Sequence, residues 1–226
     1  MLKNKAIPAY LTLCAILWIG LCVCMLVFDK SSLHLALQLP HGKAADFFFR
    51  YYSLGAEIWL YPLMALPLCF RRWRDTIVFA VAEGLSAAIV QTVKHLCNMP
   101  RPVTWFTEQF GNADALTLAE GVKMNLWHSF PSGHTATFFA FFTVCVWLWA
   151  SHNEQTCTDR QAKTTNRQWQ DITFATACFA MAAIGGYSRI YLSQHFAADV
   201  LGGSIIGTTA ALLVCYVNEI IKRKNK

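Results

Sequence analysis

A histidine and an aspartate four positions apart stand out in a short polar segment near the C-terminus. His195 and Asp199 belong to residues 188–199, which separate two long apolar runs and also contain Arg189. Ionisable side chains are costly inside a membrane, so their presence between apolar runs indicates a functional site. If the segment is helical from about His195 onward, the carboxylate can hold one ring N–H and leave the other nitrogen free. This pairing prepares an imidazole to act as a nucleophile or as a general base.

Two other polar motifs have residue types that suit an anion. Lys94 and Arg101 lie at the end of the third apolar run, and the tetrapeptide Pro-Ser-Gly-His at 131–134 opens the fourth. Arg189 completes a set of three cations. The Ser-Gly pair stands where the backbone N–H groups of a helix N-terminus are free to bind an anion.

These motifs together predict a phosphate site. Lys94, Arg101 and Arg189 offer charge-assisted hydrogen bonds to the peripheral oxygens of a phosphoryl group, and Ser132 and Gly133 offer backbone N–H groups. Of the two imidazoles, one is expected to attack phosphorus in line, and the other to protonate the departing oxygen. Pro131-Ser132 is also a normal helix start, which is compatible with anion binding because both use the same N–H groups.

The elements that must position these motifs are membrane spans. The 226 residues are 55% hydrophobic and 14% charged, too apolar for an ordinary soluble domain. We expect one polytopic membrane domain over residues 1–226, of all-α class. Six apolar runs are expected to be spans, and they cover about 7–28, 53–70, 75–96, 133–150, 172–187 and 200–221. The first of them is long enough to cross a hydrocarbon core of ~30 Å. The segments from Asp29 to about Tyr52 and from Cys97 to Phe130 are expected to be loops, the first partly in the membrane interface.

The distribution of basic residues predicts the orientation. Six spans place both termini on one side of the membrane, and basic residues concentrate on the cytoplasmic side. On the side of the termini lie Lys3, Lys5, Arg71, Arg72, Arg74, Arg160, Lys163, Arg167, Lys222, Arg223, Lys224 and Lys226. The opposite side has Lys30, Lys43, Arg50, Arg101, Lys123 and Arg189. Both termini are therefore expected in the cytoplasm, and the three motifs at the outer face.

The last span contains a stripe of small residues. Gly203, Gly207 and Ala211 follow Asp199 at intervals of four residues. Small residues at this spacing let helices approach closely in a membrane. The stripe predicts that the helix next to His195 docks firmly against a neighbour.

Several classes of function are disfavoured. The net charge of +6 resides in loops between spans and forms no continuous patch, so nucleic acid is not implied. Most of the nine cysteines fall in apolar runs, and no CxxC or His/Cys ligand spacing appears, so neither a structural disulfide nor a metal site is expected. The sequence shows no sign of an obligate protein partner. Glu57 and Glu83 lie in apolar runs outside any motif. Their roles stay open between pairing with a cation, shaping a polar pocket, remaining protonated and taking part in catalysis.

The three motifs resemble the signature of the type 2 phosphatidic acid phosphatases (PAP2). The resemblance covers Lys94 to Asp199 and the layout of six spans, with no departure at a signature position. It implies a metal-independent and cofactor-free phosphatase in which His195 becomes a phosphohistidine, Asp199 orients it and His134 protonates the leaving alcohol. It also implies that Lys94, Arg101, Ser132, Gly133 and Arg189 hold the phosphate.

The expected substrate is a lipid phosphate. The compact loops and the outer-face site are similar to bacterial members that act in the cytoplasmic (inner) membrane on lipid A phosphate, undecaprenyl pyrophosphate, phosphatidylglycerol phosphate or phosphatidate. The segments 125–142 and 188–207 favour lipid A phosphate. Two alternatives stay open: a non-catalytic carrier of lipid phosphates, which would have no use for an Asp-oriented histidine, and an enzyme like the vanadate-dependent haloperoxidases, which share the motifs but are soluble.

Overall fold

The protein is a bundle of long helices in the computed structural model, which describes residues 4–59, 62, 73–155 and 165–224. The long helices are α1 (Ala6–Val27), α5 (Trp73–Cys97), α7 (Gly133–Gln155), α8 (Thr165–Tyr191) and α9 (Ala197–Lys224). Shorter helical elements are α2 (Lys30–Leu37), α3 (Lys43–Leu54), the π-helical turn η1 (Gly55–Trp59) and α6 (Pro102–Phe110). No strand occurs in these described ranges, and the predicted all-α class is confirmed.

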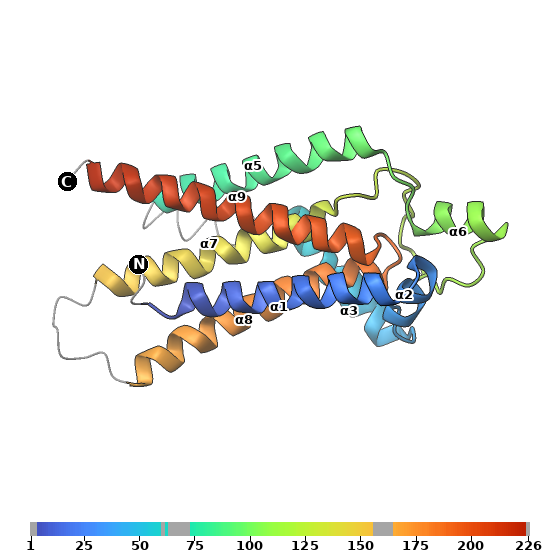
Figure 1. Cartoon of the computed structure of the whole chain (residues 1–226), viewed down its shortest axis with the longest axis horizontal. Coiled ribbons are helices and arrows are strands. Elements are labelled where there is room, and N and C mark those ends of the chain that lie inside the picture. Colours follow the sequence, from blue (N-terminus) through green and yellow to red (C-terminus); the bar gives the residue numbers. More distant parts are fainter. Residues whose placement is uncertain (1–3, 60–61, 63–72, 156–164, 225–226) are drawn as a thin grey trace.

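The long helices run lengthwise, and the two ends of the bundle differ (Figure 1). The N- and C-terminal ends of the chain lie at one end, and α2, α3 and α6 gather at the other. The central helix is α7, which packs against α9, α8, α5 and α1. Its aromatic side chains Phe138, Phe139 and Phe141 are buried in the main apolar core. The bundle therefore surrounds the helix that begins with the Gly-His of the second motif.

Four helical segments of the described chain are long and apolar enough to cross a membrane. They are Ala6–Val27, Trp73–Phe110, Gly133–Asn153 and Ala197–Lys224, and they match four of the six predicted spans. The predicted span at 172–187 lies within α8, whose 27 residues include a glycine pair and Arg189 and which is not among these four. The predicted span at 53–70 lies largely outside the described residues. Four spans are thus supported by length and composition, and the protein is a membrane protein.

The segment from Asp29 to Tyr52 is helical, and the predicted loop was wrong. Asp29 caps α2 by accepting hydrogen bonds from the backbone N–H groups of Ser31 and Ser32, each at 3.0 Å. Asp29 is therefore an ordinary N-cap. The helix that follows it begins with two serines in its first turn and not with a run of apolar residues. A second helix, α3, begins after Gly42 and packs against α8. These two helices cover the end of the bundle that contains the motifs.

The predicted loop from Cys97 to Phe130 also contains a helix, α6. Pro102 occupies its first turn, where a missing N–H is tolerated, and Gly111 ends it with φ of 81°. Phe106 is buried against Phe196, next to the catalytic candidate His195. Phe106 thus packs against a residue of the third motif.

The small-residue stripe of α9 is the contact surface with α7, as predicted. A Cβ atom on Gly203 would overlap the backbone carbonyl oxygen of Ser132, and one on Gly207 would overlap that of Ala136. Only glycine permits this approach, because the neighbouring atoms are rigid backbone. The stripe thus fixes the start of α9 against the start of α7, where the second and third motifs lie.

Candidate active site

The polar motifs meet at the end of the bundle away from the chain termini. His134 lies at the start of α7, and its charged neighbours come from two other motifs: Arg189 and His195, Lys94 and Arg101. Asp199 lies in the first turn of α9 and acts electrostatically on both Arg101 and Lys94. Residues separated by about half the chain thus share one site.

His195 and Asp199 form a buried pair. The Nδ1 atom of His195 lies 3.4 Å from Oδ2 of Asp199, and the two side chains are 1% and 6% exposed. His195 lies two residues before α9, which starts at Ala197. The pair still meets because the backbone N–H groups of Gln194 and His195 both donate to the carbonyl of Arg189, which folds the chain back before α9 begins.

The Asp199 carboxylate is held by a second set of donors. Its Oδ2 accepts a hydrogen bond of 2.5 Å from the Ser129 hydroxyl and one of 2.9 Å from the N–H of Phe196. Its backbone carbonyl accepts the N–H of Ser132 at 2.9 Å. Asp199 therefore links the third motif to the second through its backbone, and to the neighbouring Ser129 through its side chain. Ser129 was not among the residues predicted from the sequence, although it lies two positions before that motif.

Burial keeps His195 neutral. Removal from water lowers the pKa of His195 to about 3, and the adjacent Asp199 carboxylate opposes this shift only in part. A neutral imidazole with its Nδ1–H directed at Asp199 has its lone pair on Nε2. His195 is thus arranged as a nucleophile at neutral pH.

His134 has a carboxylate partner of its own. Its Nε2 atom lies 2.7 Å from Oε1 of Glu57, and the two side chains are 20% and 49% exposed. Glu57 comes from η1, directly after α3. The sequence left the role of Glu57 open, because no motif surrounds it and its partner is 77 positions away.

The Arg101 side chain donates hydrogen bonds to two residues, Trp127 and Gln194. Its Nε atom donates to the carbonyl of Trp127 at 3.0 Å, and one terminal nitrogen donates to the side-chain oxygen of Gln194, also at 3.0 Å. The Gln194 amide in turn donates to the carbonyl of Lys123 at 3.2 Å. Gln194 is 2% exposed and sits immediately before His195. It therefore couples the first motif to the segment 192–196 between α8 and α9, called the catalytic loop below because it carries the candidate His195. No sequence signal indicated this role.

Arg189 has a hydrogen-bond donor that no described residue uses. It is 7% exposed, and one terminal nitrogen donates to the Ser53 hydroxyl at the end of α3. Its Nε atom is buried and has no hydrogen-bond partner among the described residues. A buried guanidinium with an unused donor is suited to a bound anion.

Lys94 and Gly133 lie against each other. A Cβ atom on Gly133 would come within 3.8 Å of Lys94 Nζ, so the ammonium group stands at the start of α7. Ser132 is fully buried, and its hydroxyl accepts a hydrogen bond from the Thr135 hydroxyl at 2.9 Å. The first N–H groups of α7, from Gly133 and His134, therefore face a region that contains a lysine and two arginines.

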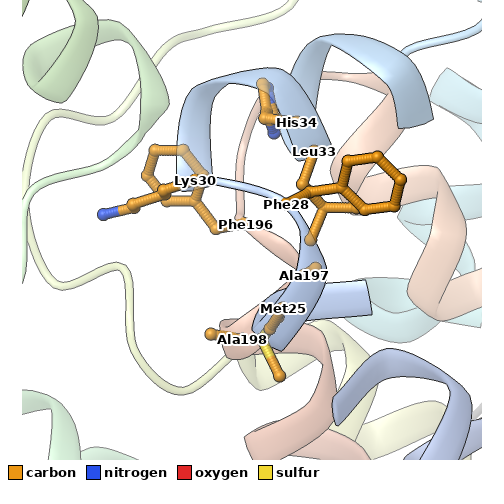
Figure 2. Close-up of a pocket in the computed structure, with 8 residues that line it drawn as sticks. All are labelled: Met25, Phe28, Lys30, Leu33, His34, Phe196, Ala197 and Ala198. Atoms are coloured by element: carbon orange, nitrogen blue, oxygen red, sulfur yellow. The ribbon is translucent and has the colours of Figure 1, made fainter. Parts of the chain in front are cut away.

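A separate cavity borders the catalytic loop on the side of α1 and α2 (Figure 2). It has a volume of about 220 Å³ and is lined mainly by apolar side chains, with Phe196 and Ala197 contributed by the loop and α9. The Lys30 ammonium lies 3.9 Å from the ring centre of Phe196. Burial lowers the pKa of Lys30, and it lowers the pKa of His34, on the cavity wall, to about 4.

The described residues contain no group of three or more His, Cys, Asp or Glu side chains placed to hold an ion. Glu83, the other acidic residue left open by the sequence, is buried in α5 and is 6% exposed.

Comparisons with known proteins place this geometry in a family. A 96-residue segment, 42% of the chain, is 30% identical to the lipid A 1-phosphatase of Porphyromonas gingivalis, and covers 18% of that protein. A 180-residue segment, 78% of the chain, is 26% identical to dolichyldiphosphatase 1 of Plecturocebus moloch, and covers 66% of it. In both cases the chain spans less than two thirds of the relative's length.

Two solved structures share the fold. The crystal structure of Aquifex aeolicus LpxE has a TM-score of 0.60 at 22% identity, over 82% of this chain and 93% of that one. A transmembrane PAP2-type phosphatidylglycerolphosphate phosphatase from Bacillus subtilis has a TM-score of 0.64 at 23% identity, over 97% of this chain and 98% of that one. The family model of the PAP2 superfamily matches residues 75–222, which is more than half of the chain and includes all three motifs. The chain therefore belongs to the PAP2 superfamily.

Proposed function

We propose that the protein removes phosphate from a lipid phosphate by way of a phosphohistidine at His195, without a metal ion or other cofactor. The observation that carries the proposal is the Asp199-held, neutral His195 in the same site as three cations. A protein that only bound lipid phosphates would need the cations but not the oriented nucleophile. All residues from 1 to 226 are proposed to form this one domain.

In the first step, Nε2 of His195 attacks phosphorus while the bond to the lipid oxygen breaks. His134 gives its proton to that oxygen, so the lipid leaves as an alcohol. Lys94, Arg101 and Arg189, with the N–H groups at Ser132–Gly133, stabilise the negative charge on the peripheral oxygens. In the second step, water attacks the phosphohistidine and gives a proton to His134. Inorganic phosphate then leaves, and both histidines have returned to their initial protonation states.

The lipid itself is proposed from the relatives. One curated relative is named for lipid A and another for dolichyl diphosphate. A phosphate of lipid A is our leading substrate, ahead of undecaprenyl pyrophosphate, phosphatidylglycerol phosphate and phosphatidate. We place the enzyme in a bacterial inner membrane, with the site on the periplasmic face and both termini in the cytoplasm.

A panel assay tests the activity. Purified protein in detergent should release inorganic phosphate from at least one of the four lipids in the presence of EDTA. His195→Ala and His134→Ala should each reduce release by more than about 100-fold. Activity that survives both substitutions would exclude the mechanism. Binding of all four lipids without turnover by the folded protein would favour a carrier, and halide oxidation after loading with vanadate would favour a haloperoxidase.

A further inference from the structure

Glu57 is placed to act on the second imidazole of the site. Its Oε1 atom lies 2.7 Å from His134 Nε2, the shorter of the two histidine–carboxylate contacts in the site; the His195–Asp199 contact is 3.4 Å. η1 carries it there, because the π-helical turn at Gly55–Trp59 continues directly from α3. Single π-helical turns often occur where a side chain must be aimed at a functional site.

We propose that Glu57 is the positioning residue of the general acid. It accepts the Nε2–H of His134, fixes the ring, and leaves Nδ1 as the nitrogen that delivers the proton to the departing oxygen. This inference rests on the function proposed above. It gives each imidazole a carboxylate of its own: Asp199 for the nucleophile and Glu57 for the acid.

The charges around His134 explain why a carboxylate is needed. The groups that face this ring are Arg189 from the end of α8, His195 from the catalytic loop, Lys94 from α5 and Arg101 before α6. Three of these are cations, so a further positive charge on His134 is unfavourable. Glu57 supplies a negative charge in contact with the ring, and it also attracts Arg189. The negative charge of Glu57 therefore offsets part of the positive charge of the groups that are proposed to bind phosphate.

The sharpest test is the charge-removing variant Glu57→Gln, because glutamine keeps an oxygen acceptor for Nε2–H. The rate of phosphate release from the best lipid of the panel is measured from about pH 5 to pH 9, in detergent and EDTA. The alkaline limb of the kcat profile reports loss of the protonated acid. It should move by about one pH unit to lower pH, with KM changed less than about twofold. Glu57→Asp should leave this limb near its wild-type position, because the charge is retained.

Glu108→Gln is the matched control. It removes an exposed carboxylate from α6 at the same end of the bundle, and its profile should superimpose on that of the wild type. An equal shift in Glu108→Gln would overturn the inference, because the effect would then come from general surface charge. An unmoved limb in Glu57→Gln together with a raised KM would also overturn it, since Glu57 would then act only through Arg189.

The proposed function and the proposed role of Glu57 are contradicted by different results. No turnover of any lipid by the wild type contradicts the proposed function, whereas an active wild type with an unmoved Glu57→Gln limb contradicts this inference alone. If Glu57→Gln does not fold, Glu57→Asp decides: a limb at the wild-type position supports the role of the charge, and a limb shifted to lower pH overturns it.

Discussion

Asp199 joins more of the site than any other single residue described above. Ser129, His195 and the N–H of Phe196 all contact its Oδ2 atom, and its backbone carbonyl binds the N–H of Ser132. A carboxylate with several donors stays ionised and fixed in direction, which is what a partner of a nucleophilic histidine requires. The Ser129 hydroxyl is the one side-chain donor in this set that is not itself part of a motif.

Ser129→Ala should lower kcat by roughly tenfold and leave KM nearly unchanged. The substitution removes one hydrogen bond that orients Asp199 but removes no group that binds phosphate. Steady-state kinetics of phosphate release measure the effect. Thr107→Ala, which deletes an exposed hydroxyl on α6, is the control and should behave as wild type. A Ser129→Ala variant with raised KM and unchanged kcat would contradict this role.

The buried histidines should make the fold sensitive to acid. The pKa of His195 is about 3 and that of His34 about 4, against an ordinary value of 6.5. Because the unfolded chain binds these protons more readily, their contribution to stability is complete above about pH 6.5 and is lost as the pH falls towards 3 to 4.

The melting temperature in detergent should therefore fall between about pH 6.5 and pH 4. His34→Gln, which removes one of the two groups and leaves His195 in place, should reduce that fall by several degrees. His95→Gln changes an exposed histidine and should leave the fall as in the wild type. A melting temperature that rises on acidification would contradict the linkage.

Single residues also show how much of the site could be predicted from the sequence. The three motifs predicted that Lys94, Arg101, His134, Arg189 and His195 would gather, because helix ends on one side of a membrane must lie together. The roles assigned to them stay predictions. Glu57 and Gln194 had no such signal, since their importance depends on distances to residues 77 and 93 positions away. Local pattern carries no information about such contacts.

At the scale of helices, the approach of α7 to α9 decides whether the site forms. Gly203 and Gly207 admit the backbone of α7 at Ser132 and Ala136. The spacing of small residues predicted this contact correctly. It did not predict α2 and α3, because the alternating leucines 33, 35, 37 and 39 suggested an interfacial loop, while the helix signal was only the cap at Asp29.

Gly207→Ala should lower both stability and activity, because the added Cβ overlaps backbone that cannot move aside. Separation of the two helices also separates His134 from His195. Gly84→Ala is the matched control on α5, where a Cβ meets nothing within 4 Å. This variant should be active and about 0.5–1 kcal/mol more stable. Thermal unfolding in detergent and phosphate release measure both; equal behaviour of the two variants would contradict the packing argument.

At the scale of the whole molecule, the two ends of the bundle carry different functions. The chain termini lie at one end, and the motifs with α2, α3 and α6 lie at the other (Figure 1). The basic C-terminal residues 222–224 belong to the terminal end. In the proposed orientation, positive charge retained in the cytoplasm directs the site outward.

Reporter fusions test this orientation. Green fluorescent protein fused after Lys226 should fluoresce, and alkaline phosphatase fused at the same position should be inactive, because both would remain in the cytoplasm. An alkaline phosphatase domain inserted at Asn112, in the segment after α6, should be active. The reverse pattern would place the site on the cytoplasmic face and exclude the proposed location.

The double attachment of Asp199 has a consequence for heat inactivation. One residue both orients the nucleophile and clamps the first turn of α9 to the residue before α7. A small screw motion between these helices would break both attachments at once, while the rest of each helix kept its hydrogen bonds. Turnover should therefore cease some degrees before helical circular dichroism declines, and loss of catalysis on heating would report helix register rather than unfolding.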